Sequence, residues 1–289
     1  MNCHLVPKFY LKRFVDPANS RLWRYSFDRG SWKQTGPRRV ASIPDYYVLT
    51  GADGLKDERI EREFLKHIEV PAGAILRNKV DAEVSLDPAE RIALARFITL
   101  MSLRVQSFHR TVGDFASEVS MTALVMASSL TDPNEHEAFL EDLKTHRLEV
   151  GHEAPMQISL SLVDNLAPYI HEMGWTFMVS EPPHYFVTSD SPFCQVNPDI
   201  VPPISGGHGL SAQNIEVSLP LSRTIAFFAG WHTHGARWIR VPPPTVEEIN
   251  RRSCADATTI LAPSPKLEGF DQILRDWEVR RTHRRFRRT

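Results

Sequence analysis

Cysteine is scarce in this 289-residue sequence, and long hydrophobic runs are absent. Cys3, Cys194 and Cys254 are far apart and outside any CxxC spacing, which argues against a disulfide framework and against a structural zinc cage. The longest apolar stretches, at 97–105 and 121–130, fall short of the roughly 18 residues that span a bilayer. We therefore expect reduced thiols and no membrane partner.

The N-terminus lacks the apolar core of a signal peptide. The segment MNCHLVPKFYLKRF carries Lys8, Lys12 and Arg13 among its first aromatic residues, which does not fit a secretory leader. We expect a cytoplasmic protein.

Familiar catalytic signatures are missing too. The sequence contains no HExxH, GxGxxG, GxxxxGKS/T or GxSxG motif. Zincin, Rossmann, P-loop and α/β-hydrolase functions therefore lack their defining residues.

Acidic residues are nearly absent from both ends of the chain. Residues 1–40 contain nine Lys or Arg and two Asp, and the last ten residues contain six Arg and no acid, although the whole chain has a net charge of −1. Basic ends on an acidic body have three explanations: they clasp the body, contact another subunit, or bind a polyanion. A solvated Arg tail with ion pairs to the body is the most common outcome.

Local patterns predict an α+β fold, with a helical middle, a C-terminal mainly antiparallel sheet and an N-terminal hairpin packed onto it. Pro7 suits the first turn of a short helix, and the alternating segments 22–27 and 32–35 flank a turn, which is typical of a hairpin. We expect a single α+β domain over residues 1–279, followed by a basic Arg-rich tail at 280–289.

Helical periodicity dominates residues 57–171. Asp87, Pro88 and Glu90 open the clearest helix, and Gly113 is predicted to separate it from a helix that ends near Leu130. After Gly174 the period changes to two, and the gaps between apolar segments are too short for helical crossovers. These segments predict five strands, at 175–180, 184–189, 215–221, 224–230 and 236–241. A last helix is expected at 245–260.

Several ordered motifs resemble one uncharacterised family. HLVPKFYLKRF, LWRY, IEREFLKHIE, FVTSDSPF and SLPLS occur in that order and are similar to the motifs of the family catalogued as domain of unknown function 4238. The resemblance names no activity and implies a single domain in which both ends cooperate. The family-like polar positions in this sequence are His4, Glu61, Glu69, Arg104 and Asp190.

Asp190 ends an apolar segment and has two interpretations. A carboxylate at the mouth of a strand, after Thr188 and Ser189, can serve as a metal ligand or general base. The same Ser-Asp-Ser-Pro stretch is also good turn chemistry, in which side chains bond the local backbone and Pro192 stops the strand.

Glu61 and Glu69 lie roughly on one helix face, about 12 Å apart along the axis at 1.5 Å per residue. That separation is too large for both to bind one small metal ion directly. Each glutamate can instead pair with a basic group such as Arg104 on the next helix, and such ion pairs are the commoner role of charged helix residues.

Histidines are the remaining candidates. His4 next to Asp190 or Glu61 would make a site for Mg²⁺, Mn²⁺ or Zn²⁺, with His4 and Asp190 as ligands. His232 and His234 share one strand face and could form a zinc pair, although the flanking glycines favour an exposed hairpin tip.

The hairpin interleaves cations with aromatics. Arg21, Arg24, Arg29 and Lys33 alternate with Trp23, Tyr25 and Trp32, which are the ingredients of single-strand nucleic-acid contact. Strand alternation instead predicts that the aromatics face inward and the cations outward.

Two functional hypotheses remain open from the sequence. The first is a metal-assisted hydrolase for a phosphorylated or nucleic-acid substrate, with Asp190 and His4 as ligand or base, Glu61 or Glu69 as second carboxylate and Arg104 as charge stabiliser. The second is a non-enzymatic binding or regulatory protein that docks RNA or an acidic partner through its basic ends.

Overall fold

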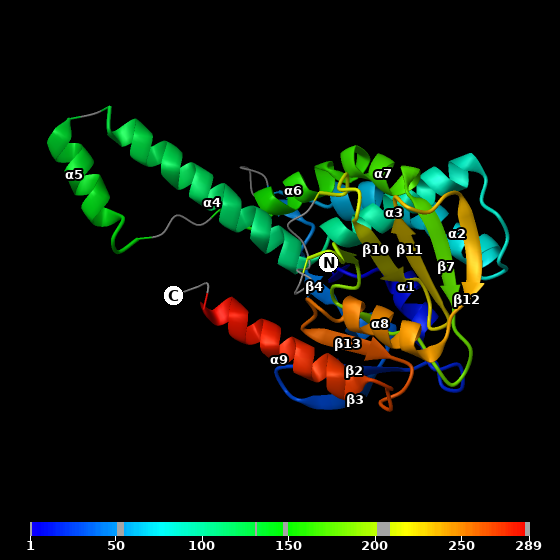
Figure 1. The fold of residues 1–289 in the computed structure, drawn as a ribbon. Helices are drawn as coiled ribbons and strands as arrows, with labels where there is room; N and C mark the ends of the chain where they lie inside the picture. Colours follow the sequence, from blue (N-terminus) through cyan, green and yellow to red (C-terminus); the bar gives the residue numbers. More distant parts are fainter. Residues whose placement is uncertain (1, 51–54, 131, 147–149, 201–208, 287–289) are drawn as a thin grey trace.

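The structure, a computed structural model, describes residues 2–50, 55–130, 132–146, 150–200 and 209–286 (Figure 1). It confirms the α+β class, with a helical middle between strand-rich ends. Among the described residues, no helix has the length and apolar composition required to cross a membrane.

The larger sheet has the strand order β12-β7-β11-β10-β9 and is antiparallel apart from the β12–β7 pair. The predicted alternating segments form most of it, because their apolar residues face layers of helix on either side. Its strands are β7 (Gly174–Val179), β9 (Cys194–Val196), β10 (Glu216–Pro220), β11 (Ile225–Gly230) and β12 (Ala236–Arg240).

The smaller sheet, of order β3-β2-β13-β8, joins the two ends of the chain. The predicted hairpin is β2 (Leu22–Ser26) and β3 (Ser31–Thr35), and β2 pairs antiparallel with β13 (Thr259–Ala262). On its other side β13 pairs with β8 (Thr188–Ser189), the only strand that the segment 184–189 forms among the described residues.

The last predicted helix was too long. Helix α8 covers Pro243–Ser253, and the last two residues of the predicted helix, 259 and 260, belong to β13 instead. The strand forms because it lies between β2 and β8, a long-range pairing that outweighs the local helical pattern.

The helical middle is confirmed, with one boundary shifted. Helix α3 (Pro88–Leu103) begins with the expected capping box of Asp87 and Glu90, but the break that follows lies at Arg104 and Val105, and α4 (Gln106–Ser128) continues through Gly113. A side chain at Gly113 would meet Pro155 at 3.2 Å, so this glycine permits close helix packing. The other elements are η3 (Ile60–Leu65), α2 (Lys66–Ile75), η4 (Leu76–Val80), α5 (Pro133–Asp142), α6 (Glu153–Ser161) and α7 (Val163–Glu172).

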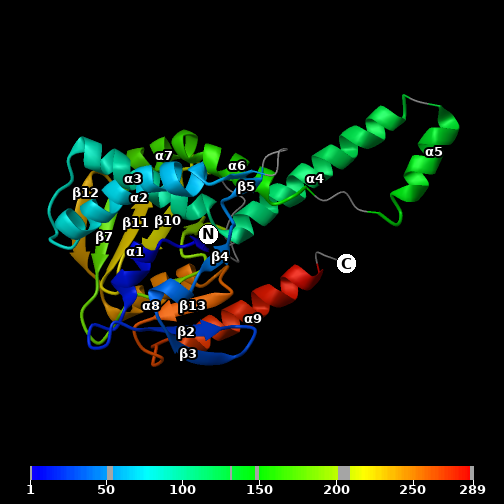
Figure 2. The same cartoon turned by 180° about the vertical axis from the view of Figure 1, so that it is seen from behind.

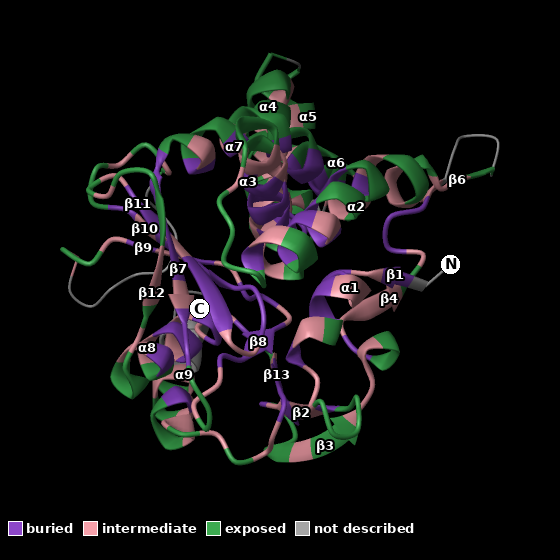
Figure 3. Cartoon of the chain, turned by 90° about the vertical axis from the view of Figure 1, so that its right-hand side faces the viewer, coloured by how far each residue is buried: buried purple, intermediate pink, exposed green. Residues whose placement is uncertain are grey.

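Helices α3 and α7 cover one face of the larger sheet through Trp175 of β7. The guanidinium of Arg91 lies 4.0 Å from the centre of the Trp175 ring, and the indole N–H donates to the carbonyl of Ile170 at 2.7 Å. Figure 3 shows that buried residues concentrate between these helices and the sheet. This layer is the main core.

The N-terminal segment packs back onto the body, as its aromatic residues predict. Tyr10, Leu11 and Phe14 are fully buried. This segment contains β1 (Asn2–His4), α1 (Lys8–Leu11) and η1 (Lys12–Phe14), and the residues after the hairpin form η2 (Pro37–Arg39), β4 (Ser42–Pro44), β5 (Leu49–Thr50) and β6 (Lys56–Asp57).

Two helical segments project from the compact body. Most of α4, with α5 folded back beside it, projects as an arm (Figure 2). Helix α9 (Phe270–Phe286) projects from the same side of the molecule, so the first part of the predicted basic tail is helical.

Candidate functional site

Arg104 is the centre of a buried polar cluster, and only 1% of its surface is exposed. Its Nη1 donates to Glu69 Oε1 at 2.5 Å, and its Nη2 donates to the backbone carbonyl of His4. The residue caps the end of α3, and the chain turns there so that the guanidinium points inward. The ion pair between Glu69 and Arg104, expected from the sequence, is therefore present.

Tyr47 and Glu61 surround the same guanidinium. The Tyr47 hydroxyl donates to the carbonyl of Arg104 at 3.2 Å, and burial raises the pKa of Tyr47 to about 12. Burial opposes the charge on Arg104, but Tyr47 and Glu69 outweigh it and raise the Arg104 pKa. The cluster is thus a charged group held inside the protein by its neighbours.

Glu61 is a carboxyl group of this cluster whose pKa is raised. Burial raises the pKa of Glu61, Arg104 lowers it and Glu69 raises it further. Its Oε2 is buried and forms no hydrogen bond with a described residue. Four of the five predicted site residues, His4, Glu61, Glu69 and Arg104, therefore gather in one place.

Asp190 belongs to a different network. Its Oδ1 accepts hydrogen bonds from the backbone N–H groups of Thr258 at 2.9 Å and Thr259 at 3.2 Å, and its Oδ2 accepts one from the Thr258 hydroxyl. Burial raises the pKa of Asp190, and these bonds partly offset that effect. The carboxylate ties β8 to the start of β13, a long-range structural contact that neither interpretation of this stretch described. The local turn bond is formed by Ser189, whose hydroxyl accepts from the Ser191 N–H at 3.1 Å.

The predicted metal ligands have different surroundings. His4 lies on β1, paired with β4, whereas Asp190 joins β8 to β13. Across the described ranges, no three His, Cys, Asp or Glu side chains form a group that could hold a metal ion. His232 and His234 are exposed in the connection between β11 and β12, and His232 contacts Asn214 at 3.1 Å.

Tyr10 brings three of the sequence motifs together. Its hydroxyl donates to the carbonyl of Pro220 at 2.6 Å and lies 3.0 Å from the Thr188 hydroxyl. Nearby, Arg13 Nε donates to the carbonyl of Leu221 at 2.6 Å. HLVPKFYLKRF, FVTSDSPF and SLPLS thus meet at one place in the core, which explains how both ends cooperate in one fold.

Three aromatics of the hairpin, Tyr25, Phe27 and Trp32, face inward. Tyr25 contacts Trp32 with ring centres 5.3 Å apart and Phe270 at 4.8 Å, and Phe27 stacks on Trp277 at 4.4 Å. These rings bind α9 to the hairpin. They are therefore engaged within the protein and not presented as a stacking platform for bases.

The cations of the N-terminal segment have few acidic partners. Of the nine Lys and Arg between residues 8 and 39, only Arg13 forms an ion pair with a described residue, with Asp81 at 2.6 Å. The other eight are Lys8, Lys12, Arg21, Arg24, Arg29, Lys33, Arg38 and Arg39.

Some of these cations lie beside one another. Arg24 and Lys33 are direct cross-strand partners, an arrangement that like charges disfavour. Burial lowers the pKa of Lys8, and the positive charges of Arg38 and Lys12 lower it further. The segment therefore holds uncompensated positive charge that an external anion can neutralise.

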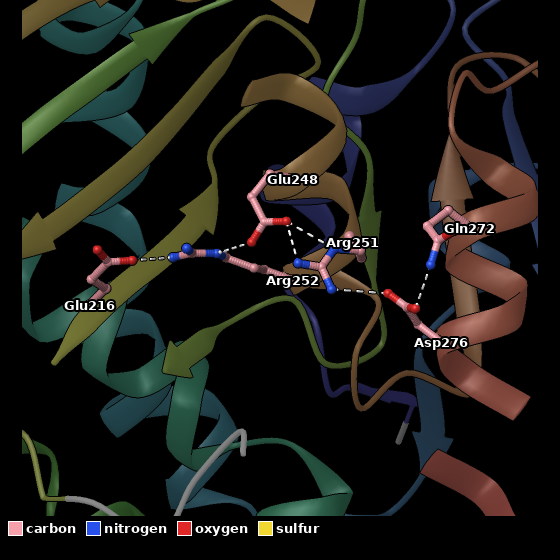
Figure 4. A network of polar contacts seen from close by, with 6 residues as sticks. All are labelled: Glu216, Glu248, Arg251, Arg252, Gln272 and Asp276. Atoms are coloured by element: carbon pink, nitrogen blue, oxygen red, sulfur yellow. Dashed lines mark hydrogen bonds and ion pairs between the residues drawn. The ribbon is translucent and has the colours of Figure 1, made fainter. Parts of the chain in front are cut away.

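The cations of α8 are instead neutralised within the fold (Figure 4). Arg252 contacts Glu216 of β10 at 2.6 Å and Glu248 at 2.7 Å. Arg251 contacts Glu248 at 2.5 Å and Asp276 of α9 at 3.0 Å. This network connects the larger sheet, α8 and α9.

A cavity of about 360 Å³ lies between α8 and the segment that leads into α9. It is lined by apolar residues and by a His184–Glu268 pair, in which His184 Nδ1 is 2.5 Å from Glu268 Oε2. Ser264 and Lys266 also line it. No sequence pattern pointed to this pair, because its members are 84 positions apart and in no motif.

A second cavity of about 500 Å³ lies beside strand β4, and Ile43 and Pro44 of that strand line it. Tyr46 lines it, with the His152 ring 5.6 Å away. The Tyr46 hydroxyl is 2.7 Å from Nδ1 of buried His109, and burial lowers the pKa of His109 to about 4. The ring of His109 is therefore neutral at pH 7.

The chain belongs to the family described as protein of unknown function, DUF4238, which matches residues 2–266. The match includes both strand-rich ends and the helical middle, and it stops before α9. No curated protein and no solved structure matches the chain.

Proposed function

We propose that this protein binds nucleic acid, with RNA as the expected form, through the phosphate backbone and without turnover. The observation that carries the proposal is the contrast in ion pairing. Eight of the nine cations at 8–39 have no acidic partner among the described residues, whereas ten of the 18 described Lys and Arg between 56 and 275 have one.

Uncompensated cations favour a polyanion because binding releases the counterions that surround the phosphates. The like-charge neighbours Arg24 with Lys33, and Lys8 with Lys12 and Arg38, lose their mutual repulsion when a phosphate lies between them. Since Tyr25 and Trp32 of the hairpin pack inward, the proposed contact involves phosphates more than bases. We therefore propose binding with little sequence preference.

The test is fluorescence anisotropy of labelled single-stranded RNA, duplex RNA and duplex DNA of one length, at 50 and 200 mM salt. Replacing Lys8, Lys12 and Arg38 by Gln should weaken binding about tenfold or more and flatten the salt dependence, since each lost phosphate contact removes about 0.9 from the slope of log K against log salt.

The matched control removes three cations that already have partners. Arg59, Arg62 and Lys144 are exposed and paired with Asp57, Glu58 and Glu141, so their replacement by Gln changes the net charge equally. The proposal fails if the control variant loses as much affinity as the first variant, or if none of the three nucleic acids binds. Binding to duplex DNA alone would overturn the choice of RNA.

We propose a hydrolase of phosphorylated or nucleic-acid substrates as the second candidate, on the strength of the His184–Glu268 pair in the 360 Å³ cavity. A carboxylate that holds one ring nitrogen of a histidine leaves the other nitrogen to take a proton from water. Lys266 lines the same cavity and supplies a positive charge for a phosphate.

Turnover of bis-p-nitrophenyl phosphate, with and without Mg²⁺, Mn²⁺ or Zn²⁺, tests this candidate. Activity that His184→Gln abolishes and exposed His234→Gln leaves intact supports it. Activity that depends on His4 and Asp190 instead would restore the metal site predicted from the sequence. No turnover under any condition removes the candidate.

A further inference from the structure

The cavity beside β4 has walls from separate parts of the chain, and neither proposed function uses it. Its lining comes from β4 and the turn after it, from β6, and from the starts of α4 and α6. Its volume is about 500 Å³, and pockets that bind small ligands have volumes of about 300–1,000 Å³. The cavity can therefore hold one ring system such as a nucleobase.

Aromatic rings form one wall of this cavity. Tyr46 is 8% exposed, its hydroxyl lies 2.7 Å from Nδ1 of His109, and the two rings stack with centres 5.6 Å apart. The centre of the exposed His152 ring is 5.6 Å from that of Tyr46. Ring contacts thus lead from buried His109 through Tyr46 to His152, which lines the cavity. A flat base that lies on His152 extends this series, since bases of single strands stack on Tyr and His side chains.

The polar groups of the cavity match the edge of a base that carries an amino group. Asp45 Oδ2 accepts a hydrogen bond from Lys56 Nζ at 2.6 Å, which lowers the pKa of Asp45 to about 2 and keeps its carboxylate charged at pH 7. Gln106 and Glu153 line the same cavity, and neither side chain forms a hydrogen bond or ion pair with a described residue. A carboxylate accepts from the amino group of cytosine, and a carboxamide matches the amino group and N7 of adenine. The lining therefore favours adenine or cytosine over uracil, which has no amino group.

The charge of the lining keeps phosphates outside the cavity. Its acidic and basic residues are two carboxylates and one lysine, so the lining disfavours an anion. Cations lie beside it, because β4 pairs with β1, which leads into Lys8 of α1 (Figure 3), and Arg39 precedes Ile43 by four residues. Four residues of extended chain span at most about 14 Å, a distance that about four nucleotides cover at about 3.4 Å per phosphate of one strand. A strand bound to these cations can therefore place a base in the cavity.

We infer that this cavity takes one unpaired adenine or cytosine from a single strand of RNA whose phosphates lie on the cations of residues 8–39. The base stacks on His152, and Gln106 and the carboxylates bond its amino edge. Bases in a duplex are already stacked and paired, so the cavity favours single strands. The inference rests on the proposed nucleic-acid binding and adds to it a base preference at one position.

Fluorescence anisotropy of the full chain with four labelled 12-nucleotide strands tests this inference. The strands are oligo(A), oligo(C), oligo(U) and a strand of the same length without bases. Oligo(A) and oligo(C) are expected to bind at least about tenfold more tightly than the other two, since one well-placed base contact discriminates by about that factor. Equal affinities for all four strands overturn the inference and leave the proposed phosphate contact intact, whereas no binding of any strand removes the proposed function.

Two variants assign the base preference to the cavity. Gln106→Ala and His152→Ala change exposed lining residues, and each should reduce the preference for oligo(A) over oligo(U) to less than about threefold with the affinity for oligo(U) unchanged. Gln157→Ala is the matched control, because Gln157 is exposed on α6 and lies outside the cavity lining; it should keep the preference. A preference that survives both variants, or that the control loses equally, overturns the inference.

Free adenosine tests the cavity independently of strand binding. In saturation-transfer NMR with adenosine and uridine at equal concentration, transfer to the adenine ring protons is expected, with much less transfer to uridine. His152→Ala should abolish the adenosine signal. No transfer to adenosine, or a signal that His152→Ala leaves unchanged, overturns the inference even if the strands bind.

Discussion

Arginines in two regions of this protein have opposite surroundings. On α8, Arg251 and Arg252 each contact two carboxylates, and the network joins β10 to α9. On the hairpin, Arg24 lies opposite Lys33 and has no acidic partner among the residues that the structure describes. The same side chain therefore connects elements in one region and leaves a charge for a partner in the other.

This difference shows that pairing, more than composition, distinguishes cations that connect elements of the fold from cations that do not. A paired and partly buried arginine is costly to remove, because its carboxylate stays behind without compensation. An exposed arginine without a partner adds almost nothing to stability. Substitutions of the two kinds should therefore have opposite effects on stability and on binding.

The largest effect is expected at Arg104, the fully buried member of the paired class. Arg104→Met removes the partner of Glu69 and the donor to His4, and breaking a buried ion pair in this way costs about 3–5 kcal/mol of the free energy of unfolding. Urea denaturation measures the loss. Arg77→Met, at an exposed position of the neighbouring η4, is the control; a loss below about 1 kcal/mol at Arg104 would show that the cluster is not structural.

A pH effect of similar size is expected from His109. Its pKa is about 4 in the folded protein and about 6.5 in the unfolded chain. Between these values the unfolded chain binds the proton, so stability is full above pH 6.5 and falls as the pH drops to about 4, by up to about 3 kcal/mol. Thermal unfolding from pH 7 to 4 tests this: His109→Gln should flatten the curve, whereas a slope equal to that of the unchanged protein would assign the effect to other groups.

A moderate loss is expected at Arg252. Its side chain is 19% exposed and bridges Glu216 and Glu248, so Arg252→Ala should lower the free energy of unfolding by about 1–3 kcal/mol. Arg24→Ala is the comparison, with no expected loss beyond about 0.5 kcal/mol. Equal losses at the two positions would remove the distinction between the paired and unpaired regions.

The smallest effect on stability is expected at Lys12, and the sharpest test of the comparison sets Lys12 against Asp190. Asp190→Ala leaves the N–H groups of Thr258 and Thr259 without their acceptor and should cost about 1–3 kcal/mol with no change in RNA affinity. Lys12→Gln should leave stability within about 0.5 kcal/mol and weaken RNA binding. The reverse pattern would return Asp190 to a functional role.

The sequence predicted the helix caps and strands correctly where the interactions that form them are local. Asp87 and Glu90 predicted a capping box that is present, and alternation predicted both β2 and the inward-facing Tyr25. Arg104, which the sequence offered as a partner for either Glu61 or Glu69, pairs with Glu69, because the end of α3 lies beside α2.

Long-range contacts account for what the sequence did not predict. Residues 259 and 260 were predicted as the end of a helix, and pairing with β2 and β8 makes them part of strand β13. His184 meets Glu268 across 84 positions, and Asp190 is held by Thr258 and Thr259 at the start of β13. Periodicity predicted α4 but gave no sign that its outer half leaves the body, since exposure depends on what packs beside it.

The position of β13 between β2 and β8 has a consequence for synthesis of the protein. The hairpin leaves the ribosome early, but its partner strand follows more than 230 residues later. Until then β2 has an unpaired edge, and such edges recruit other chains. During translation the hairpin must therefore remain shielded, and its density of like charges provides one means of keeping nascent chains apart.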